Sequence, residues 1–232
     1  MSNRRNFDAS AYFVVGPENT KGRPVVQIIK AVVETGYTCV QIRSKTATAH
    51  ELIELTAQVS DIIADSGRVS EVALLVNDRL DVILSARKQG IKVDGIHVGQ
   101  TDIPVEVCRE YLGEDSIVGL STRPHDLLKY IQTANISYVD YFGVGPLHET
   151  QTKLDCAINH DGKMLVRSFD EIAQLARISP IPLVVGGGVK LSDIPLLART
   201  GVGGFFVVSA ISEADDPKTE ALKLIEAWKA NR

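Results

Sequence analysis

The chain has 232 residues, of which 44% are hydrophobic and 23% are charged, with a formal net charge of −4. This composition is ordinary for a globular protein with a large apolar core. The acidic balance disfavours nucleic acid as a partner, because binding a phosphate backbone requires a basic surface. Phosphorylated small molecules stay open as ligands, since a local cluster of basic side chains is enough to hold them.

No membrane segment or secretion signal is indicated. No apolar run approaches the roughly 18 residues of a membrane span, and the basic start, residues 1–6, leads into no apolar signal region. Three cysteines lack disulfide-framework or zinc spacing, namely Cys39, Cys108 and Cys156. We therefore expect a reduced, cytoplasmic protein without membrane partners, and we leave homo-oligomer formation open.

Short apolar runs rich in β-branched residues alternate with amphipathic stretches along the chain. The runs favour buried strands, because Val, Ile, Phe and Tyr pack well on a pleated surface. Eight strands are predicted, at Tyr12–Val15, Thr38–Ile42, Ala73–Val76, Val93–Val98, Ser116–Leu120, Tyr138–Val144, Pro182–Val185 and Gly204–Val208.

Helical spacing of apolar residues fills the intervals between these strands. The faces of the longest helices are Val25, Ile28, Val32 and Val33 after Pro24, then Leu52, Leu55, Val59 and Ile62, and finally Leu222, Ile225 and Trp228. Asp216-Pro217 suits the N-cap and first position of the last helix. Shorter helices are predicted at Leu80–Lys88, Val105–Leu112, Pro124–Thr133, Phe169–Arg177 and Leu191–Arg199.

Eight strand-then-helix units predict a single (β/α)8 barrel, the TIM barrel. The 232 residues divide into units of about 29, the size of a βαβ repeat. A doubly wound open sheet is the alternative, but Tyr12–Pro17 carries no glycine-rich dinucleotide fingerprint. No linker divides the chain, so we expect one domain over residues 1–232, with a flexible N-terminus over residues 1–10.

Candidate functional residues, most of them polar or glycine, gather at the carboxyl ends of the predicted strands. In chain order they are Gln41, Arg43 and Lys45; Asn77 and Asp78; Gly99 to Asp102; Ser121; Thr150 to Lys153; Gly186 to Gly188; and Val208 and Ser209. In a (β/α)8 barrel these strand ends meet at one rim, which carries the active site. The loops after the seventh and eighth strands often bind phosphate there.

The charged members of this rim suit a polyanion and a metal ion. Arg43 and Lys45 alone fit a solvated strand end equally well, but with Lys153 they fit a phosphate-rich ligand. Asp78 and Asp102 favour Mg²⁺, which takes one or two carboxylates plus substrate oxygens and water, over a plain turn.

The uncharged members have simpler alternatives. Three consecutive glycines, 186–188, either make a tight turn or let backbone N–H groups approach an anion. None of the five histidines shows nucleophile–base or metal spacing. We expect none of them to be catalytic, and His97 to be packed or hydrogen-bonded within its strand.

Together these residues resemble the thiamine-phosphate synthase (thiamine monophosphate pyrophosphorylase) family. The resemblance runs from about Tyr12 to Pro217. It rests on Gln41-Ile42-Arg43-Ser44-Lys45, Val76-Asn77-Asp78-Arg79, Asp94 to Asp102, Gly145-Pro146, Thr150-Gln151-Thr152-Lys153, Gly187-Gly188 and Ser209-Ala210-Ile211. Each motif is weak alone, but their order at successive strand ends is specific.

The resemblance implies a transferase that joins 4-amino-2-methyl-5-hydroxymethylpyrimidine diphosphate to 4-methyl-5-(2-phosphoethyl)thiazole. The implied pyrimidine diphosphate ligands are Gln41, Ile42, Arg43, Ser44, Lys45, Asn77, Ser121 and Lys153, and Arg43, Lys45, Ser121 and Lys153 are implied to be catalytic. The implied Mg²⁺ ligands are Asp78 and Asp102. The implied thiazole phosphate ligands are Thr150, Gln151, Thr152, Gly188, Val208 and Ser209.

The implied reaction is dissociative: pyrophosphate leaves, and the thiazole nitrogen attacks the remaining pyrimidine methylene cation. Such a step needs charge stabilisation and alignment but no protein nucleophile. The chain departs from the family at His148-Glu149, where an aromatic and a small residue or proline are expected, and at Arg123, where histidine is frequent.

Three alternatives use the same scaffold. They are a thiazole tautomerase-like paralogue, another phosphate-binding lyase or isomerase, and a non-catalytic thiazole-phosphate-binding regulator. Arg43, Lys45 and the two rim aspartates argue against the tautomerase, which has no diphosphate to neutralise. No strand interior carries a lysine suited to Schiff-base chemistry, which argues against the lyase.

Overall fold

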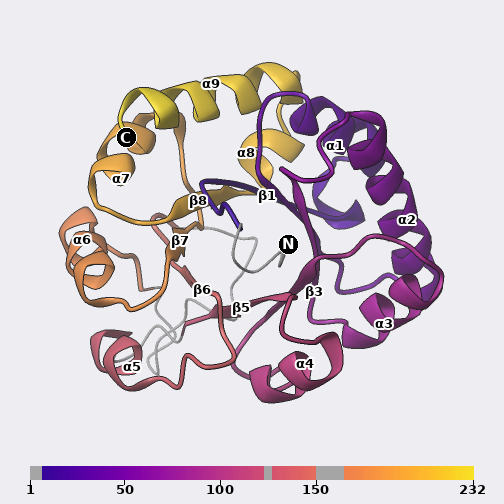
Figure 1. Cartoon of the computed structure of the whole chain (residues 1–232). Coiled ribbons are helices and arrows are strands. Elements are labelled where there is room, and N and C mark those ends of the chain that lie inside the picture. The colour runs from indigo at the N-terminus through magenta and orange to yellow at the C-terminus, as the bar shows by residue number, and fades with distance from the viewer. Residues whose placement is uncertain (1–6, 123–126, 150–164) are drawn as a thin grey trace.

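A computed structural model describes residues 7–122, 127–149 and 165–232 of the chain. Eight parallel strands form a closed barrel in which each strand pairs with the next and β8 pairs with β1 (Figure 1). They are β1 (Ala11–Val15), β2 (Cys39–Ile42), β3 (Ala73–Asn77), β4 (Gly95–Val98), β5 (Ile117–Ser121), β6 (Tyr141–Val144), β7 (Leu183–Val185) and β8 (Gly204–Val207). The predicted (β/α)8 barrel is confirmed.

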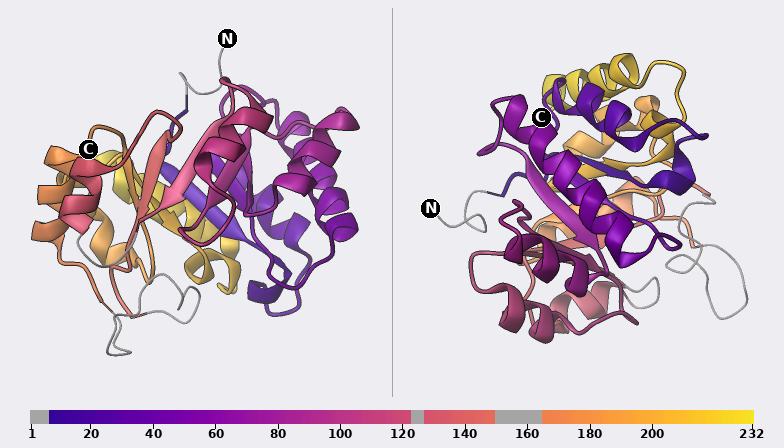
Figure 2. Two further views of the ribbon diagram at one scale, coloured as in Figure 1. Left: turned by 90° about the horizontal axis from the view of Figure 1, so that it is seen from below. Right: turned by 90° about the vertical axis from the view of Figure 1, so that its right-hand side faces the viewer.

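Helices surround the strands, as Figure 2 shows from two further sides. They are α1 (Val25–Val33), α2 (Ala49–Asp65), α3 (Leu80–Lys88), α4 (Val105–Leu112), α5 (Leu127–Thr133), α6 (Phe169–Ile178), α7 (Ile194–Arg199), α8 (Ser209–Ser212) and α9 (Pro217–Ala230). The predicted cap of α9 is confirmed, because the Asp216 carboxylate accepts from the Thr219 backbone N–H at 3.1 Å. The short helix α8 was not predicted. No helix in the described ranges is long and apolar enough to cross a membrane.

Two predicted strand starts are wrong by more than one residue, and in both places an arginine binds the backbone. Val93 and Tyr138 were expected to begin strands, but β4 begins at Gly95 and β6 at Tyr141. The Val93 carbonyl accepts from Arg87 Nε at 3.0 Å, and the Tyr138 carbonyl accepts from Arg109 Nη2 at 3.2 Å. Both carbonyls therefore bind guanidinium groups where a strand would need ladder partners.

Two apolar layers hold the barrel together. The larger one lies between the strands and the helices, where outward residues such as Phe13 and Ile42 pack against the helix faces. The smaller one fills the barrel with inward residues, including Tyr12, Leu75 and Tyr141. Gly119 makes room for this filling, because a Cβ there would lie 2.1 Å from Cζ of Tyr141.

The described part of the N-terminus lies against the same interior layer. The Phe7 ring lies 5.3 Å from the Tyr141 ring, centroid to centroid, and Ala9 is 5% exposed. Residues 7–10 thus contribute packing at the amino ends of the strands.

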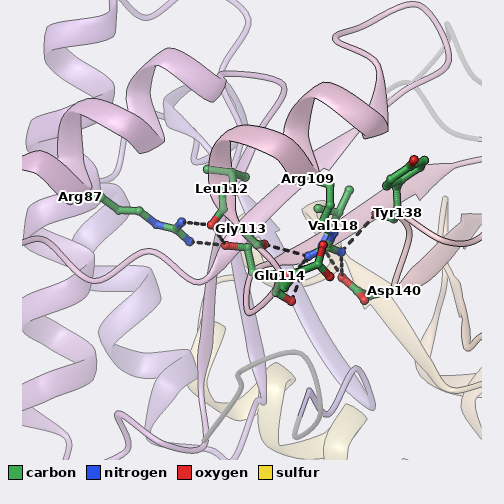
Figure 3. A network of polar contacts seen from close by, with 9 residues as sticks. Arg87, Arg109, Leu112, Gly113, Glu114, Val118, Tyr138 and Asp140 are labelled. Atoms are coloured by element: carbon green, nitrogen blue, oxygen red, sulfur yellow. Dashed lines mark hydrogen bonds and ion pairs between the residues drawn. The ribbon is translucent and has the colours of Figure 1, made fainter.

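A buried ion pair lies at the same end of the barrel (Figure 3). Arg109 Nη2 donates to Asp140 Oδ2 at 2.8 Å, and both side chains are almost fully buried. The Asp140 carboxylate also accepts from the Val118 backbone N–H at 2.7 Å, while Arg109 donates to the Ser116 carbonyl at 2.6 Å. The pair therefore ties α4 to the starts of β5 and β6, away from the rim that carries function in this fold.

Asp140→Ala should cost about 3–5 kcal/mol of unfolding free energy, because it leaves the Arg109 charge buried without its partner. Urea denaturation measures this cost. The matched control is Asp115→Ala, an exposed carboxylate on the same side of the barrel, which should change stability by less than about 0.5 kcal/mol. Equal effects of the two substitutions would contradict the structural role of the pair.

Candidate active site

The carboxyl end of β2 delivers cationic side chains to the rim. Lys45 follows this strand, and its Nζ donates to Asp78 Oδ2 at 2.6 Å. Burial alone would lower the pKa of Lys45, but the ion pair with Asp78 raises it above its ordinary value, while the positive charge of Arg43 opposes that rise. Arg43, Lys45 and Asp78 therefore form one charged cluster.

Two carboxylates meet in this cluster. Burial raises the pKa of Asp78 and the negative charge of Asp102 raises it further, while Lys45 counteracts both. The Asp102 Oδ2 accepts from the Gly99 backbone N–H at 2.8 Å, which fixes that carboxylate after β4. The predicted pair of rim aspartates is thus brought together, with more negative charge than Lys45 alone balances.

The backbone of Asp78 is unusual. Its φ of 61° lies in the left-handed region, which a residue other than glycine seldom occupies. Its N–H donates to the His97 carbonyl at 2.9 Å, which holds the turn against β4. Strained positions of this kind cluster at functional sites, where the surrounding structure maintains them.

The donor set of this cluster fits Mg²⁺. Among the residues that the structure describes, no third histidine, cysteine, aspartate or glutamate completes a protein cage around the two carboxylates. Magnesium commonly binds through one or two carboxylates and completes its octahedron with water and substrate phosphate oxygens. Asp78 and Asp102 supply such a partial shell, and a divalent cation would relieve the repulsion between them.

A chain of hydrogen bonds crosses the barrel interior beneath the rim. Gln41 Nε2 donates to Tyr12 Oη, Tyr12 Oη bonds Tyr141 Oη, Tyr141 Oη bonds His97 Nδ1, and His97 Nε2 bonds Ser121 Oγ, each at 2.8 Å. Burial raises the pKa of both tyrosines well above the ordinary value, so both hydroxyls stay neutral. His97 is bonded in place within its strand, as expected.

Both ends of this chain are predicted substrate ligands. Gln41 is 1% exposed, and its Oε1 has no partner among the described residues. Ser121 ends β5, and Asn77, another predicted ligand, ends β3 beside His97. A buried oxygen without a hydrogen-bond partner is energetically costly, and Gln41 Oε1 is one of a few such atoms among the described residues.

Sequence reasoning missed the side chains that support these ligands. Tyr12 and Tyr141 appeared only as members of apolar strands. Their signal is the period of two, because Tyr12 shares the inward phase of β1 with Val14, and Tyr141 shares that of β6 with Gly143. Ile42, another predicted ligand, has the opposite phase, and its side chain packs in the outer apolar layer.

Glycines shape the loops after β6 and β7. Gly188 has a φ of 72°, and a Cβ there would lie 2.8 Å from the Cβ of His148. His148 N donates to the Gly187 carbonyl at 3.0 Å, and His148 Nε2 lies 2.9 Å from Asp193 Oδ2. The unexpected histidine therefore joins the two loops, and the Glu149 that follows it is exposed.

Two further predicted ligands, Val208 and Ser209, lie within the described residues. Val208 follows β8 and Ser209 begins α8, both on the side of the rim formed by β7 and β8. Four other predicted ligands lie outside the described residues, namely Thr150, Gln151, Thr152 and Lys153. Arg123 lies outside them as well. The residues of the charged cluster and of the interior hydrogen-bond chain come from β1 to β6 and the loops that follow these strands.

A closed barrel with charged and polar groups at the carboxyl rim is the arrangement of (β/α)8-barrel enzymes. A family model described as thiamine monophosphate synthase matches residues 11–211. A thiamine-phosphate synthase of Corynebacterium efficiens is 36% identical over 229 residues, 97% of each chain. One of Natronomonas pharaonis is 34% identical over 220 residues, 95% of each chain. The chain therefore belongs to the thiamine monophosphate synthase family.

Solved structures agree on the fold. A thiamine phosphate pyrophosphorylase from Pyrococcus furiosus superimposes with a TM-score of 0.76 at 23% identity, covering 97% of this chain and 98% of that one. A 3-hexulose-6-phosphate synthase superimposes with a TM-score of 0.65 at 13% identity, covering 94% of this chain and 99% of that one. The family membership confirms the resemblance drawn from the motifs and the expected transferase activity of a thiamine-phosphate synthase.

Tyr141→Phe should cost about 1–3 kcal/mol of unfolding free energy, because it removes the hydroxyl that joins Tyr12 to His97 inside the barrel. The matched control is Tyr37→Phe. Tyr37 is fully buried, but its hydroxyl has no partner among the described residues, so its removal should be neutral or stabilising. Denaturation curves of both variants measure the difference, and a Tyr141→Phe curve that matches the control would contradict the hydrogen-bonded chain.

Proposed function

We propose that the chain joins a pyrimidine diphosphate to a thiazole phosphate, giving thiamine phosphate and pyrophosphate, with Mg²⁺ held by Asp78 and Asp102. The observation that carries this proposal is the charged cluster at the rim. In it, Lys45 Nζ lies 2.6 Å from Asp78 Oδ2, and the Asp102 carboxylate lies beside Asp78. A diphosphate leaving group is stabilised by positive charge, which cationic side chains and a carboxylate-held metal ion can supply. Membership of the thiamine monophosphate synthase family supports the proposed reaction.

The leaving group is stabilised by charge. When bound, Mg²⁺ neutralises diphosphate oxygens and so lowers the barrier to their departure. Lys45 exchanges its bond to Asp78 for one to the diphosphate, and Arg43 adds a planar donor fork. Lys153, which lies outside the described residues, is proposed as the third cation.

Alignment of the two substrates supplies the rest of the catalysis. Apart from the cations, the proposed pyrimidine diphosphate ligands are Gln41, Ile42, Ser44, Asn77 and Ser121, and the proposed thiazole phosphate ligands are Thr150, Gln151, Thr152, Gly188, Val208 and Ser209. The methylene–oxygen bond breaks with its electron pair on the pyrophosphate, and the thiazole nitrogen lone pair forms the new carbon–nitrogen bond. No proton transfer is required, so no general base is assigned.

The setting of the enzyme is also proposed. We infer a cytoplasmic enzyme that binds phosphorylated small molecules and no nucleic acid. The net charge of −4 supports the absence of nucleic acid. Cys39 and Cys108 are buried free thiols, in keeping with a reducing compartment. Homo-oligomer formation is left open.

The test measures pyrophosphate release from both substrates, with and without Mg²⁺. Wild-type protein should release pyrophosphate only with Mg²⁺, and Asp78→Ala should lower the rate by about 100-fold or more, because a metal ligand is lost. Binding of thiazole phosphate, measured by calorimetry, should be unchanged in this variant. A tautomerase or a regulator would release no pyrophosphate at all.

The matched control is Asp81→Ala. Asp81 is an exposed aspartate on α3 that pairs with Arg79 at 2.7 Å, so its loss removes a nearby carboxylate without touching the cluster. Its rate should equal the wild-type rate. Near-normal turnover of Asp78→Ala would show that the metal assignment is wrong.

A further inference from the structure

One carboxylate without an assigned role, that of Glu18, contacts the cationic segment of the rim, residues 43–47 after β2. Glu18 lies in the 3-10 turn η2 (Pro17–Asn19), which follows β1. Its Oε1 accepts from Ser44 Oγ at 2.5 Å, from the backbone N–H of Lys45 at 2.9 Å, and from the N–H and Oγ1 of Thr46 at 3.2 and 2.9 Å. A single side chain from the loop after β1 thus organises the loop after β2.

The segment that Glu18 contacts is built as a compact turn. Ser44 Oγ also accepts from the backbone N–H groups of Thr46 at 3.2 Å and Ala47 at 2.9 Å. On the other side, Gly16 lies against the same segment, since a Cβ on Gly16 would be 1.7 Å from the Arg43 carbonyl oxygen. The two loops are therefore fitted to each other from Arg43 to Ala47.

The charge of Glu18 makes this contact informative. Burial alone would raise the pKa of Glu18, but the hydrogen bonds from Ser44, Thr46 and the Lys45 backbone lower it below the ordinary value, so the group is an anion at neutral pH. An anion at this position repels a diphosphate bound by the same segment. Electrostatics alone therefore disfavours Glu18 here, and its benefit must come from geometry.

The contacts also show which hydrogen-bond donors of the segment are already bound to Glu18. Glu18 uses the backbone N–H groups of Lys45 and Thr46, so a phosphate cannot take those donors without displacing it. The side chains of Arg43 and Lys45 stay available to an anion, since neither donates to Glu18. With the turn fixed, Lys45 Nζ lies at the carboxylate cluster, 2.6 Å from Asp78.

We propose that Glu18 is a positioning residue, which fixes the turn after β2 so that Arg43 and Lys45 meet the diphosphate through their side chains. This inference rests on the proposed function and adds to it a residue from the loop after β1. Glu18 does not itself touch substrate. It acts through the four hydrogen bonds to Ser44, Lys45 and Thr46.

The test is a comparison of Glu18→Ala and Glu18→Gln. The glutamine oxygen can still accept from Ser44 and the backbone, whereas alanine loses all four bonds. We expect Glu18→Ala to raise KM for the pyrimidine diphosphate by about 10-fold or more, with KM for thiazole phosphate unchanged, and Glu18→Gln to stay near wild type. If Glu18 mattered only as a charge, both variants would bind the diphosphate more tightly than wild type.

The matched control is Glu51→Ala. Glu51 caps α2 just beyond the same turn by accepting from Thr48 N at 2.7 Å, so its loss tests whether any weakening of this region changes KM. It should leave both KM values at the wild-type level. A Glu18→Ala variant with wild-type or lower KM for the diphosphate, or a Glu51→Ala variant with an equal increase, would overturn the positioning role.

A binding measurement separates this inference from the proposed function. Inorganic pyrophosphate with Mg²⁺ is titrated into each protein by calorimetry, which needs no turnover. Weaker binding by about 10-fold in Glu18→Ala, with Glu18→Gln and Glu51→Ala unchanged, supports the role of Glu18. Unchanged binding in Glu18→Ala overturns it. Wild-type protein that binds pyrophosphate but releases none from the two substrates contradicts the proposed function alone.

Discussion

The repulsion between Asp78 and Asp102 is the interaction on which the rim depends. Two carboxylates close together in a partly buried place are unfavourable unless positive charge lies between or beside them. Lys45 supplies part of that charge through its 2.6 Å contact with Asp78. Arg43 adds a second positive charge near Lys45, so the rim brings two cationic and two anionic side chains into one cluster.

Much of this arrangement follows from the sequence because it follows from local pattern. The barrel was predictable from alternation, and the positions of Gln41, Asn77, Asp78, Asp102 and Ser121 from their places at strand ends. The rest depends on which side chains meet across the barrel. The period of two points Tyr12 into the barrel, but nothing in the sequence indicates that Tyr12 bonds Tyr141 of β6 or that Glu18 bonds Ser44 after β2. Side-chain contacts of high sequence separation leave no periodic signal.

The two ends of the barrel use charge in opposite ways. At the amino ends, Arg109 and Asp140 pair with each other and bond the surrounding backbone, so that their opposite charges offset each other. At the carboxyl rim, Arg43, Lys45, Asp78 and Asp102 form a more exposed cluster, in which burial and the charge of Asp102 still raise the pKa of Asp78. The first arrangement ties α4 to the starts of β5 and β6, and the second leaves the Lys45 side chain half exposed at the rim. This division matches the general separation of stability and activity in the fold.

The hydrogen bonds through the barrel interior have a consequence for strand register. Ladder bonds alone tolerate a slip of two residues, because such a shift leaves every side chain on its original face. The Tyr12–Tyr141 bond joins β1 to β6 and the Tyr141–His97 bond joins β6 to β4, and neither pair of strands is adjacent in the barrel. These bonds across the barrel interior form only at one relative register of the strands. They therefore favour one shear of the barrel and also support the side chains beneath its rim.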